Sequence, residues 1–290
     1  MRGIISRFAP APTGFLHLGH VVNAVHVWGE TRARARAAGA APGRVLLRIE
    51  DHDRQRSRRE FESAILDDLA WLGFVADEPL ARQSERDDIY LQALDTLRRQ
   101  GLVYACACSR TDVEQAETNV AQAFRPANAG LKPRATPEVR YPGTCADRGL
   151  SEGPGLGLRV RLEPSVERFV DLRLGSQEQQ PSEQCGDLLV RDRDGNWTYQ
   201  FAATVDDHVQ GVTLVIRGVD LLASTGRQIQ LSRLFGRVEP PAFLHHPLIM
   251  KSPTQKLSKS DGDTGIRELR AQGWTPAQVI ERAMALVQSG

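Results

Sequence analysis

The sequence predicts an α/β protein with a doubly wound, Rossmann-like sheet. Short apolar runs alternate with segments of helical spacing over the first hundred residues, and the alternation resumes after residue 187. A loop rich in proline and glycine joins the first apolar run to the first helix, and ligands of open α/β sheets bind at strand ends of this kind. The composition, with 41% hydrophobic and 25% charged residues, is that of a globular protein with an ample core.

The first strand and the first helix follow from the residue pattern. Residues 3–8 form a short apolar run that predicts a buried strand. The segment A-P-A-P-T-G at 9–14 excludes regular structure because it holds two prolines and a glycine. Apolar residues at helical positions then predict a largely buried helix from Phe15 to about Ala38, followed by a turn at 39–43.

A second strand and two further helices complete this half of the chain. Residues 45–49 are apolar and precede the charged loop E-D-H-D-R, which predicts a strand that ends in a polar loop. Apolar residues three and four apart predict a helix over 61–72 that ends at Gly73. Another helix is expected over 89–97 and ends before Gly101.

The pattern breaks in the middle of the chain. Residues 111–157 are polar with little periodicity, and they predict an insertion with long loops. Residues 158–162 alternate apolar side chains with arginine, as in a half-exposed strand. Residues 191–196 predict a hairpin turn between two apolar runs.

A second strand–helix unit follows the break. The segment 201–208 is expected to be a helix or a strand that ends on carboxylates, and 213–218 a strand that ends at a glycine turn. Residues 224–236 predict an amphipathic helix. One or two helices are expected around 279–287.

Charge and cysteine content limit the classes of protein to which the chain can belong. The net charge is only +1, so no general basic field demands a nucleic-acid partner, although the arginines at 54–59 leave that partner open. The N-terminus lacks the apolar run of a signal peptide, and no apolar stretch approaches the roughly 18 residues that span a bilayer. Four unevenly spaced cysteines without an export signal fit metal binding or free thiols better than disulfides. We therefore expect a cytoplasmic protein without a membrane segment, and a monomer.

The segment H-L-G-H at 17–20 lies where a loop opens the first helix. A helix N-terminus offers unpaired N–H groups and partial positive charge to an anion. His17 and His20 are three residues apart and share one face of the first turn, while Gly19 lets a phosphate or a flat ring approach the backbone. A histidine pair alone is more often structural, but its place after a Pro-x-Pro-x-Gly loop favours a phosphate site.

Lysine is rare in this chain and concentrated in one place. Lys251, Lys256 and Lys259 are three of the four lysines, and they lie in the stretch M-K-S-P-T-Q-K-L-S-K-S. Lysine is a compact point charge on a flexible stem, which suits a phosphate whose charge shifts. The stretch predicts a mobile phosphate-handling loop, and a solvated basic loop is the alternative.

These motifs together resemble a known enzyme family. H-L-G-H resembles the HIGH signature of class I aminoacyl-tRNA synthetases, and K-L-S-K-S at 256–260 resembles their KMSKS loop. R-F-A-P-A-P-T-G, R-I-E-D-H-D, V-D-D-H and I-R-G-V-D-L-L-A-S-T-G-R-Q resemble the glutamyl subgroup of that family. The resemblance implies a nucleotide-binding catalytic domain with its first half at 1–100, an insertion with a zinc site at 101–186, its second half at 187–240, and the lysine loop with a short C-terminal helical segment at 241–290.

The resemblance also implies a glutamate pocket and an ATP site. The glutamate contacts carried over from the subgroup are Arg7, Phe8, Ala9, Pro10, Ala11, Glu50, Tyr199 and Arg217. The set suits glutamate, because arginine forks bind a side-chain carboxylate and a carboxylate binds an α-ammonium group. ATP is assigned to His17, Gly19, His20 and Lys259.

The implied reaction is the activation of L-glutamate as an adenylate. The glutamate α-carboxylate attacks the α-phosphate of ATP, pyrophosphate leaves, and Mg²⁺ accompanies the nucleotide. Charge grows on the phosphoryl oxygens, so positioning and electrostatic stabilisation carry the catalysis. The catalytic assignments are His17 and His20 to the phosphates, and Lys256 and Lys259 to the leaving pyrophosphate.

Three cysteines outside this site predict a metal. Cys106 and Cys108, with the distant Cys145, make a plausible zinc site that needs one more ligand. In the subgroup, C-x-C followed by Y-x-x-x-C holds one structural zinc ion, which implies Tyr141 as the fourth ligand. The alternatives for that position are His52, His208 and Cys185, and three free cysteines remain a further alternative.

The acceptor of the activated glutamate separates branches of the subgroup. The chain has only about thirty residues after the lysine loop, whereas a full glutamyl synthetase carries an anticodon-binding domain there. With the cysteine element, the chain resembles the branch that activates glutamate without tRNA and transfers it to queuosine in the anticodon loop of tRNA(Asp). The alternatives are a truncated synthetase that charges a tRNA 3′ end and a binding protein without turnover.

Overall fold

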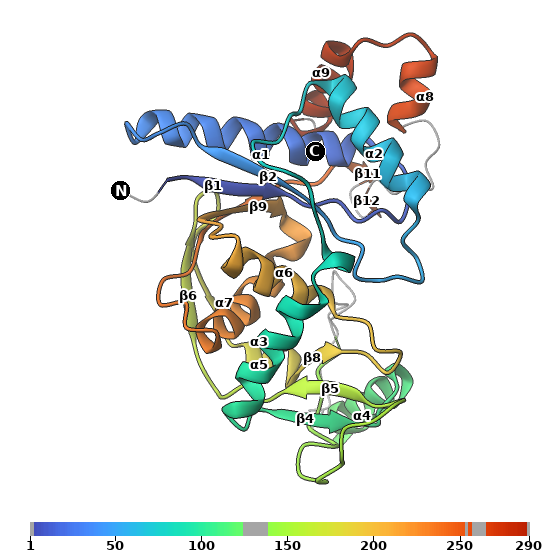
Figure 1. Ribbon diagram of the computed structural model, residues 1–290, viewed down its shortest axis with the longest axis vertical. Helices are drawn as coiled ribbons and strands as arrows, with labels where there is room; N and C mark the ends of the chain where they lie inside the picture. The colour runs from blue at the N-terminus through green and yellow to red at the C-terminus, as the bar shows by residue number, and fades with distance from the viewer. Residues whose placement is uncertain (1–2, 124–138, 253–254, 257–264, 289–290) are drawn as a thin grey trace.

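A parallel sheet of two parts lies at the centre of the protein (Figure 1). The structure, a computed structural model, describes residues 3–123, 139–252, 255–256 and 265–288. One part of the sheet holds the parallel strands β1 (Ile5–Phe8), β2 (Arg44–Ile49) and β3 (Ala81–Arg82). The other part holds the parallel strands β9 (Leu214–Gly218), β10 (Ala242–His246) and β6 (Glu167–Asp171), with β7 (Gly175–Gln179) antiparallel at its edge.

The two parts meet at β1 and β9. The backbone N–H of Thr213 donates to the carbonyl of Ile5 over 2.9 Å, and the Ile5 N–H donates to the Thr213 hydroxyl, also over 2.9 Å. From β1 the chain continues to β2 on one side of this seam, and from β9 it continues to β10 on the other. The seam is therefore the point where the strand order reverses, as the doubly wound expectation requires.

Helices cover both faces of the central sheet (Figure 1). On one face lie α1 (Leu18–Ala37), α2 (Arg59–Leu72) and α9 (Pro276–Gln288), and on the other lie α6 (Tyr199–Val209) and α7 (Thr225–Leu234). The core between α1 and the sheet is built from fully buried side chains such as Val21, Val27, Val45 and Ile49. The segment 201–208, for which the sequence allowed a helix or a strand, is helical.

A smaller antiparallel sheet forms the other end of the molecule (Figure 1). It consists of β4 (Val103–Cys106), β5 (Gly157–Val160) and β8 (Leu188–Arg191), with α3 (Asp87–Arg99) packed on it through a second core cluster. The membership of strands in the two sheets does not coincide with the expected boundaries along the chain. β6 and β7 belong to the central sheet although they lie within 101–186, and β8 pairs with β5 although it follows 187.

Two expectations for the middle of the chain are wrong. Helix α4 (Arg110–Ala123) occupies the start of the segment that was expected to be loop. Ser109 and Asp112 cap its first turn reciprocally: the Ser109 N–H donates to the Asp112 carboxylate over 2.7 Å and the Asp112 N–H to the Ser109 hydroxyl over 3.1 Å. Strand β5 is buried along its whole length rather than half-exposed, because Arg159 packs against the cysteines.

Short elements complete the described chain. They are the helices α5 (Pro181–Cys185) and α8 (Ile266–Ala271), the 3₁₀ turns η1 (Gln83–Glu85) and η2 (Val219–Ser224), and the paired strands β11 (Met250–Ser252) and β12 (Gln255–Lys256).

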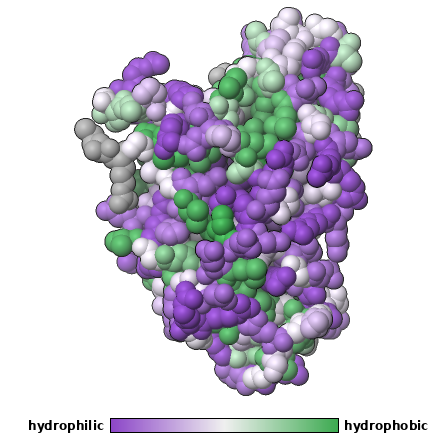
Figure 2. Space-filling view, in the orientation of Figure 1, coloured by the Kyte–Doolittle hydropathy of each residue, from purple (hydrophilic) through white to green (hydrophobic). Residues whose placement is uncertain are grey.

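The visible face of the molecule is mostly hydrophilic, with apolar side chains in separate groups (Figure 2). None of the helices among the described residues is both long and apolar enough to cross a bilayer.

Candidate functional site

Three of the predicted glutamate contacts lie at the carboxyl ends of parallel strands beside the seam. Arg7 is the third residue of β1, Arg217 the fourth residue of β9, and Glu50 directly follows β2. Because ligands of open α/β sheets bind where the strand order reverses, this edge is the expected position of a substrate site. All three residues are nearly buried: Arg7 is 4% exposed, Arg217 3% and Glu50 7%.

A chain of buried ion pairs connects Arg7 to Glu50. Arg7 Nε donates to Asp207 Oδ1 over 3.0 Å, and Arg48 Nη1 donates to the same oxygen over 2.8 Å. Arg48 Nη2 then reaches Glu50 Oε1 at 3.1 Å. Burial alone would lower the pKa of Arg48, but Asp207, Asp206 and Glu50 outweigh burial and raise it, so this arginine is a fixed cation. Burial would likewise raise the pKa of Asp207, but Arg7 and Arg48 outweigh burial and lower it.

Arg217 is held in a different way, because the groups that accept its hydrogen bonds are neutral. Its Nε donates to His245 Nε2 over 3.1 Å, Nη1 to Gln228 Oε1 over 2.7 Å, and Nη2 to Thr225 Oγ1 over 2.8 Å. Tyr199, at the start of α6, lies beside this guanidinium group. Burial lowers the pKa of Arg217, with Tyr199 acting in the opposite direction. A buried cation with neutral contacts is a favourable partner for an anionic ligand.

Residues 8–11 fix the loop that follows β1. Phe8 is buried and packs against Trp28 of α1, with ring centroids 5.5 Å apart. The Pro10 carbonyl accepts the Glu50 N–H over 3.0 Å, so the loop is tied to the end of β2. Pro10 is buried, and Ala9 and Ala11 are partly exposed. The backbone of residues 8–11 therefore runs along the same edge as Arg7 and Glu50, whereas the Phe8 side chain belongs to the core against α1.

The H-L-G-H segment forms the N-terminal cap of α1. His17 is the N-cap, its Nδ1 accepts the Gly19 N–H over 3.0 Å, and His20 Nδ1 accepts the His17 N–H over 3.1 Å. The two rings lie 4.0 Å apart between centroids. A Cβ at Gly19 would lie 2.8 Å from His17 Cε1, so a side chain would displace the cap. The first turn holds no acidic residue, which favours an anion at this end.

The backbone after the lysine loop returns to this cap. Gly265 pairs with His17 in an antiparallel bridge, and the Ile266 N–H donates to the Leu16 carbonyl over 3.0 Å. Lys259 lies outside the described residues, and of Lys256 the structure describes only the backbone, in β12. The chain that follows the loop is thus fixed beside the histidine pair, whereas the positions of the lysine side chains stay a prediction.

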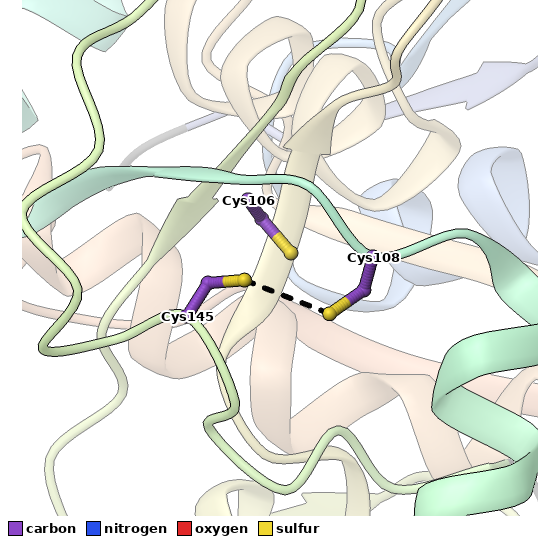
Figure 3. A group of neighbouring side chains, drawn as sticks. All are labelled: Cys106, Cys108 and Cys145. Carbon is purple, nitrogen blue, oxygen red and sulfur yellow. Dashed lines mark hydrogen bonds between the residues drawn. The ribbon is translucent and has the colours of Figure 1, made fainter.

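The predicted metal ligands come together at the edge of the small sheet (Figure 3). The sulfur atoms of Cys106, Cys108 and Cys145 all lie within 4.8 Å of one another and point toward a common centre. The Cys108 and Cys145 sulfurs are 3.6 Å apart. The Tyr141 hydroxyl lies 3.4 Å from Cys106 Sγ and accepts the Cys145 N–H over 2.8 Å.

This donor set fits a zinc ion. Three thiols and a phenol hydroxyl converge, as a four-coordinate structural site requires. Burial would raise the pKa of the Cys145 thiol, but hydrogen bonds from the Ala107 amide, Cys108, Tyr141 and Arg148 lower it to about 7. Burial and the hydrogen bond with Cys145 raise the pKa of Cys108 to about 12, so the metal-free cluster favours one thiolate.

The alternative fourth ligands point elsewhere. The Cys185 thiol donates to the Pro181 carbonyl, while its own carbonyl accepts the Tyr141 N–H. His52 Nδ1 lies 2.6 Å from Gln83 Oε1, and the ring of His208 faces Phe235. Among the described residues, the metal-type cluster contains only the three cysteines predicted from the sequence.

Sequence reasoning missed the residues that support the arginines. Arg48 and Asp207 lie inside quoted motifs and His245 lies outside them, but none of the three was assigned a role. The available signal was the placement of charged residues within otherwise apolar strands, since Arg48 is fully buried in β2. Such side chains are buried only when they are paired.

A basic cavity opens beside the candidate site. It has a volume of about 530 Å³ and lies between the loop after β2 and the start of α2, next to Pro12. The charged residues in its wall are Asp51, Arg54, Arg58, Arg59, Glu62, Arg82 and Glu85. Arg54 pairs with Asp87 and Arg82 with Glu62, whereas the exposed Arg58 donates to backbone carbonyls.

The chain is similar to proteins of one family over nearly its whole length. The family model "tRNA synthetases class I (E and Q), catalytic domain" matches residues 3–287. A "Glutamyl-Q tRNA(Asp) synthetase" of Rhodobacter capsulatus is 38% identical over 288 residues, which cover 95% of this chain and 98% of that protein. A protein of the same name from Albidiferax ferrireducens is 40% identical, with 89% and 85% covered.

A solved structure gives the same picture of the fold. The crystal structure of a glutamate tRNA ligase from Elizabethkingia meningosepticum in complex with its amino acid superposes with a TM-score of 0.70 at 29% sequence identity. The match covers 90% of this chain and 53% of that protein, so the chain spans about half the length of this solved relative.

Proposed function

Because this chain belongs to the class I tRNA synthetases of the E and Q type, and is a ligase of the aminoacyl-tRNA synthetase type, we propose that it activates L-glutamate with ATP. The activated glutamate is then transferred to queuosine in the anticodon loop of tRNA(Asp), and activation needs no tRNA. The names of the relatives support this acceptor. The preference for glutamate rests on one observation, the buried Arg217 with neutral partners.

The charge pattern of the site suits glutamate in particular. The side-chain carboxylate of glutamate can take the open positions on Arg217, with Tyr199 beside it. Glutamine offers a neutral amide whose N–H groups would face an arginine, which can only donate hydrogen bonds. Glu50, at the end of β2, supplies the negative charge for the substrate α-ammonium group.

In the proposed reaction the glutamate α-carboxylate attacks the α-phosphorus of ATP. A new P–O bond forms, and the bond to the leaving pyrophosphate breaks. His17 and His20, at the cap of α1, stabilise the phosphates together with the positive end of the helix dipole. Lys256 and Lys259 follow the charge as it moves onto pyrophosphate, and Mg²⁺ bound with ATP offsets phosphate charge.

We propose one structural zinc ion on Cys106, Cys108 and Cys145, with the Tyr141 hydroxyl as fourth ligand. The ion would tie β4 to the loop that carries Tyr141 and Cys145, two segments that are otherwise far apart in sequence. A structural zinc ion adds its binding free energy to folding.

The basic cavity beside Pro12 is our candidate docking place for the RNA substrate. Exposed arginines without carboxylate partners suit phosphodiester groups. The cavity lies next to Asp51, directly after Glu50, so RNA bound there would lie close to the activated glutamate.

Two assays test the proposal. The first is ATP–pyrophosphate exchange with glutamate and without RNA, in zinc-replete protein; absence of exchange would refute glutamate activation. The second compares transfer of radioactive glutamate to tRNA(Asp) with and without queuosine. Incorporation that ignores queuosine would favour charging of a tRNA 3′ end, which is the alternative function.

A further inference from the structure

Arg217, His245 and Asp171 form a hydrogen-bonded row of three buried side chains. Arg217 Nε lies 3.1 Å from His245 Nε2, and His245 Nδ1 lies 2.7 Å from Asp171 Oδ2. The exposed fractions are 3% for Arg217, 0% for His245 and 1% for Asp171. The three residues come from β9, β10 and β6, neighbouring parallel strands whose carboxyl ends lie at the substrate edge.

We propose that Asp171 and His245 are positioning residues that fix the orientation of Arg217 for the substrate carboxylate. The inference rests on the proposed function, because it names what orients a residue of that site. Neither residue needs to touch the substrate.

The hydrogen bonds determine which nitrogen of His245 carries the proton. An arginine can only donate, so His245 Nε2 must accept from Arg217 Nε. The proton therefore sits on Nδ1 and is donated to Asp171. Asp171 can only accept, since its Oδ2 also receives the His245 backbone N–H over 3.1 Å and its Oδ1 receives the N–H groups of Arg173 and Leu174.

The remaining contacts fix the plane of the guanidinium group. Gln228 accepts from Nη1 over 2.7 Å and Thr225 from Nη2 over 2.8 Å. With His245 on Nε, these contacts use three of the five N–H groups of arginine and leave one on each terminal nitrogen. These two are available to a bound carboxylate, and Tyr199 lies beside them.

The imidazole of His245, between Arg217 and Asp171, leaves Arg217 better able to bind an anion. A carboxylate in direct contact would orient Arg217 but would also occupy the N–H groups and offset the charge that the ligand needs, as Asp207 does for Arg7. Asp171 acts one ring further away, so it fixes the tautomer of His245 while Arg217 remains a donor to the ligand.

Two substitutions of His245 separate its two roles. Asparagine places its amide near the Nδ1 position, so His245→Asn keeps a group for Asp171 and loses the acceptor for Arg217. Glutamine reaches the Nε2 position, so His245→Gln keeps an acceptor for Arg217. We expect His245→Asn to raise the KM for glutamate about 10-fold or more, and His245→Gln to recover most of that loss. The KM for ATP should change less than about 2-fold in both variants, within what distant substitutions do.

Asp171→Asn tests the hydrogen bond on the far side of His245, between His245 Nδ1 and Asp171. The backbone N–H groups of Arg173 and Leu174 hold the amide oxygen on their side, so the amide NH₂ faces His245 Nδ1. The imidazole proton must then move to Nε2, against Arg217 Nε. A rise of about 10-fold in the KM for glutamate, with the KM for ATP unchanged, is expected.

The matched control is His246→Asn. His246 is similarly buried, but its ring nitrogens contact Pro247 and Asn23 rather than Arg217. It should leave the ratio of the two KM values unchanged. A ¹⁵N spectrum of the wild-type protein should show His245 protonated at Nδ1.

Three results would overturn the inference: equal changes in the KM for glutamate and ATP in His245→Asn, no recovery in His245→Gln, or a proton on Nε2 in the wild type. Absence of exchange in the wild type would instead overturn the proposed function. In that event the ¹⁵N spectrum would still decide whether His245 donates to Asp171 and accepts from Arg217.

Discussion

Replacing Arg217 by alanine should weaken glutamate binding selectively. Arg217 is 3% exposed and donates its hydrogen bonds to neutral groups, so its charge is available to the ligand. A hydrogen bond to a charged group contributes about 1.5–3 kcal/mol, and a fork can make two of them. Even about 3 kcal/mol corresponds to a rise in the KM for glutamate on the order of 100-fold.

The assay is ATP–pyrophosphate exchange without RNA, measured over a range of glutamate concentrations. The KM for ATP should stay close to the wild-type value, because the α1 cap lies on a different element from Arg217. Arg217→Lys keeps the positive charge but loses the fork, so its KM should fall between those of the wild type and Arg217→Ala.

Arg233→Ala is the matched control for Arg217→Ala. Arg233 pairs with Glu167 at 2.7 Å and is not among the predicted substrate contacts, so its removal should leave both KM values unchanged. Thermal unfolding of each variant separates a loss of folding from a loss of binding. A folded Arg217→Ala protein with an unchanged KM for glutamate would refute the glutamate pocket.

Four further predictions address the lysine loop, the zinc ion, the RNA surface and pH. Lys259→Ala should slow glutamate activation by orders of magnitude in a single-turnover assay while the melting temperature stays close to that of the wild type. Metal analysis should find one zinc ion per chain, lost in Cys145→Ser but kept in Cys185→Ser, because the Cys185 thiol donates to the Pro181 carbonyl outside the cluster. Arg58→Ala should reduce the transfer of glutamate to tRNA(Asp) without changing RNA-free exchange, and equal effects on both would remove the cavity as a docking place. Burial lowers the pKa of His246 to about 4 from 6.5, so the unfolded chain takes up this proton first as the pH falls. The contribution of His246 to the free energy of unfolding is therefore full above pH 6.5 and falls by about 3 kcal/mol toward pH 4. Urea unfolding should find this loss reduced in His246→Asn.

Local sequence rules were sufficient for the elements that carry the site. The strand ends at Arg7, Glu50 and Arg217 follow from apolar runs that stop at proline, charged or glycine residues. The turn chemistry and the helical spacing after it likewise predicted α1, although the helix begins at Leu18 rather than at Phe15 and the cap made by His17 was not predicted. These features depend on neighbours within a few residues, which is the range over which periodicity and capping act.

Contacts between distant segments could not be predicted in the same way. Arg48 reaches Asp207 across 159 positions, and a sequence without an alignment gives no sign of this pair. The hydrogen bonds of Tyr141 with Cys106 and Cys145 likewise depend on how the chain folds back onto β4. Helix α4 was missed for a different reason: its Ser109–Asp112 cap is visible in the sequence, but the low periodicity of the segment concealed it.

The charges around the cysteine cluster support the full four-ligand zinc site. Three thiolates and a phenolate carry four negative charges, and a zinc ion offsets two of them. Two arginines face the remaining charge: Arg159 Nε lies 3.4 Å from Cys106 Sγ with its guanidinium carbon 3.5 Å above the Tyr141 ring, and Arg148 Nη1 lies 3.7 Å from Cys145 Sγ. Arg159 is only 7% exposed, and a metal-free cluster with a single thiolate would offset the charge of the two arginines only in part. The arrangement therefore favours the proposed zinc site over three free cysteines.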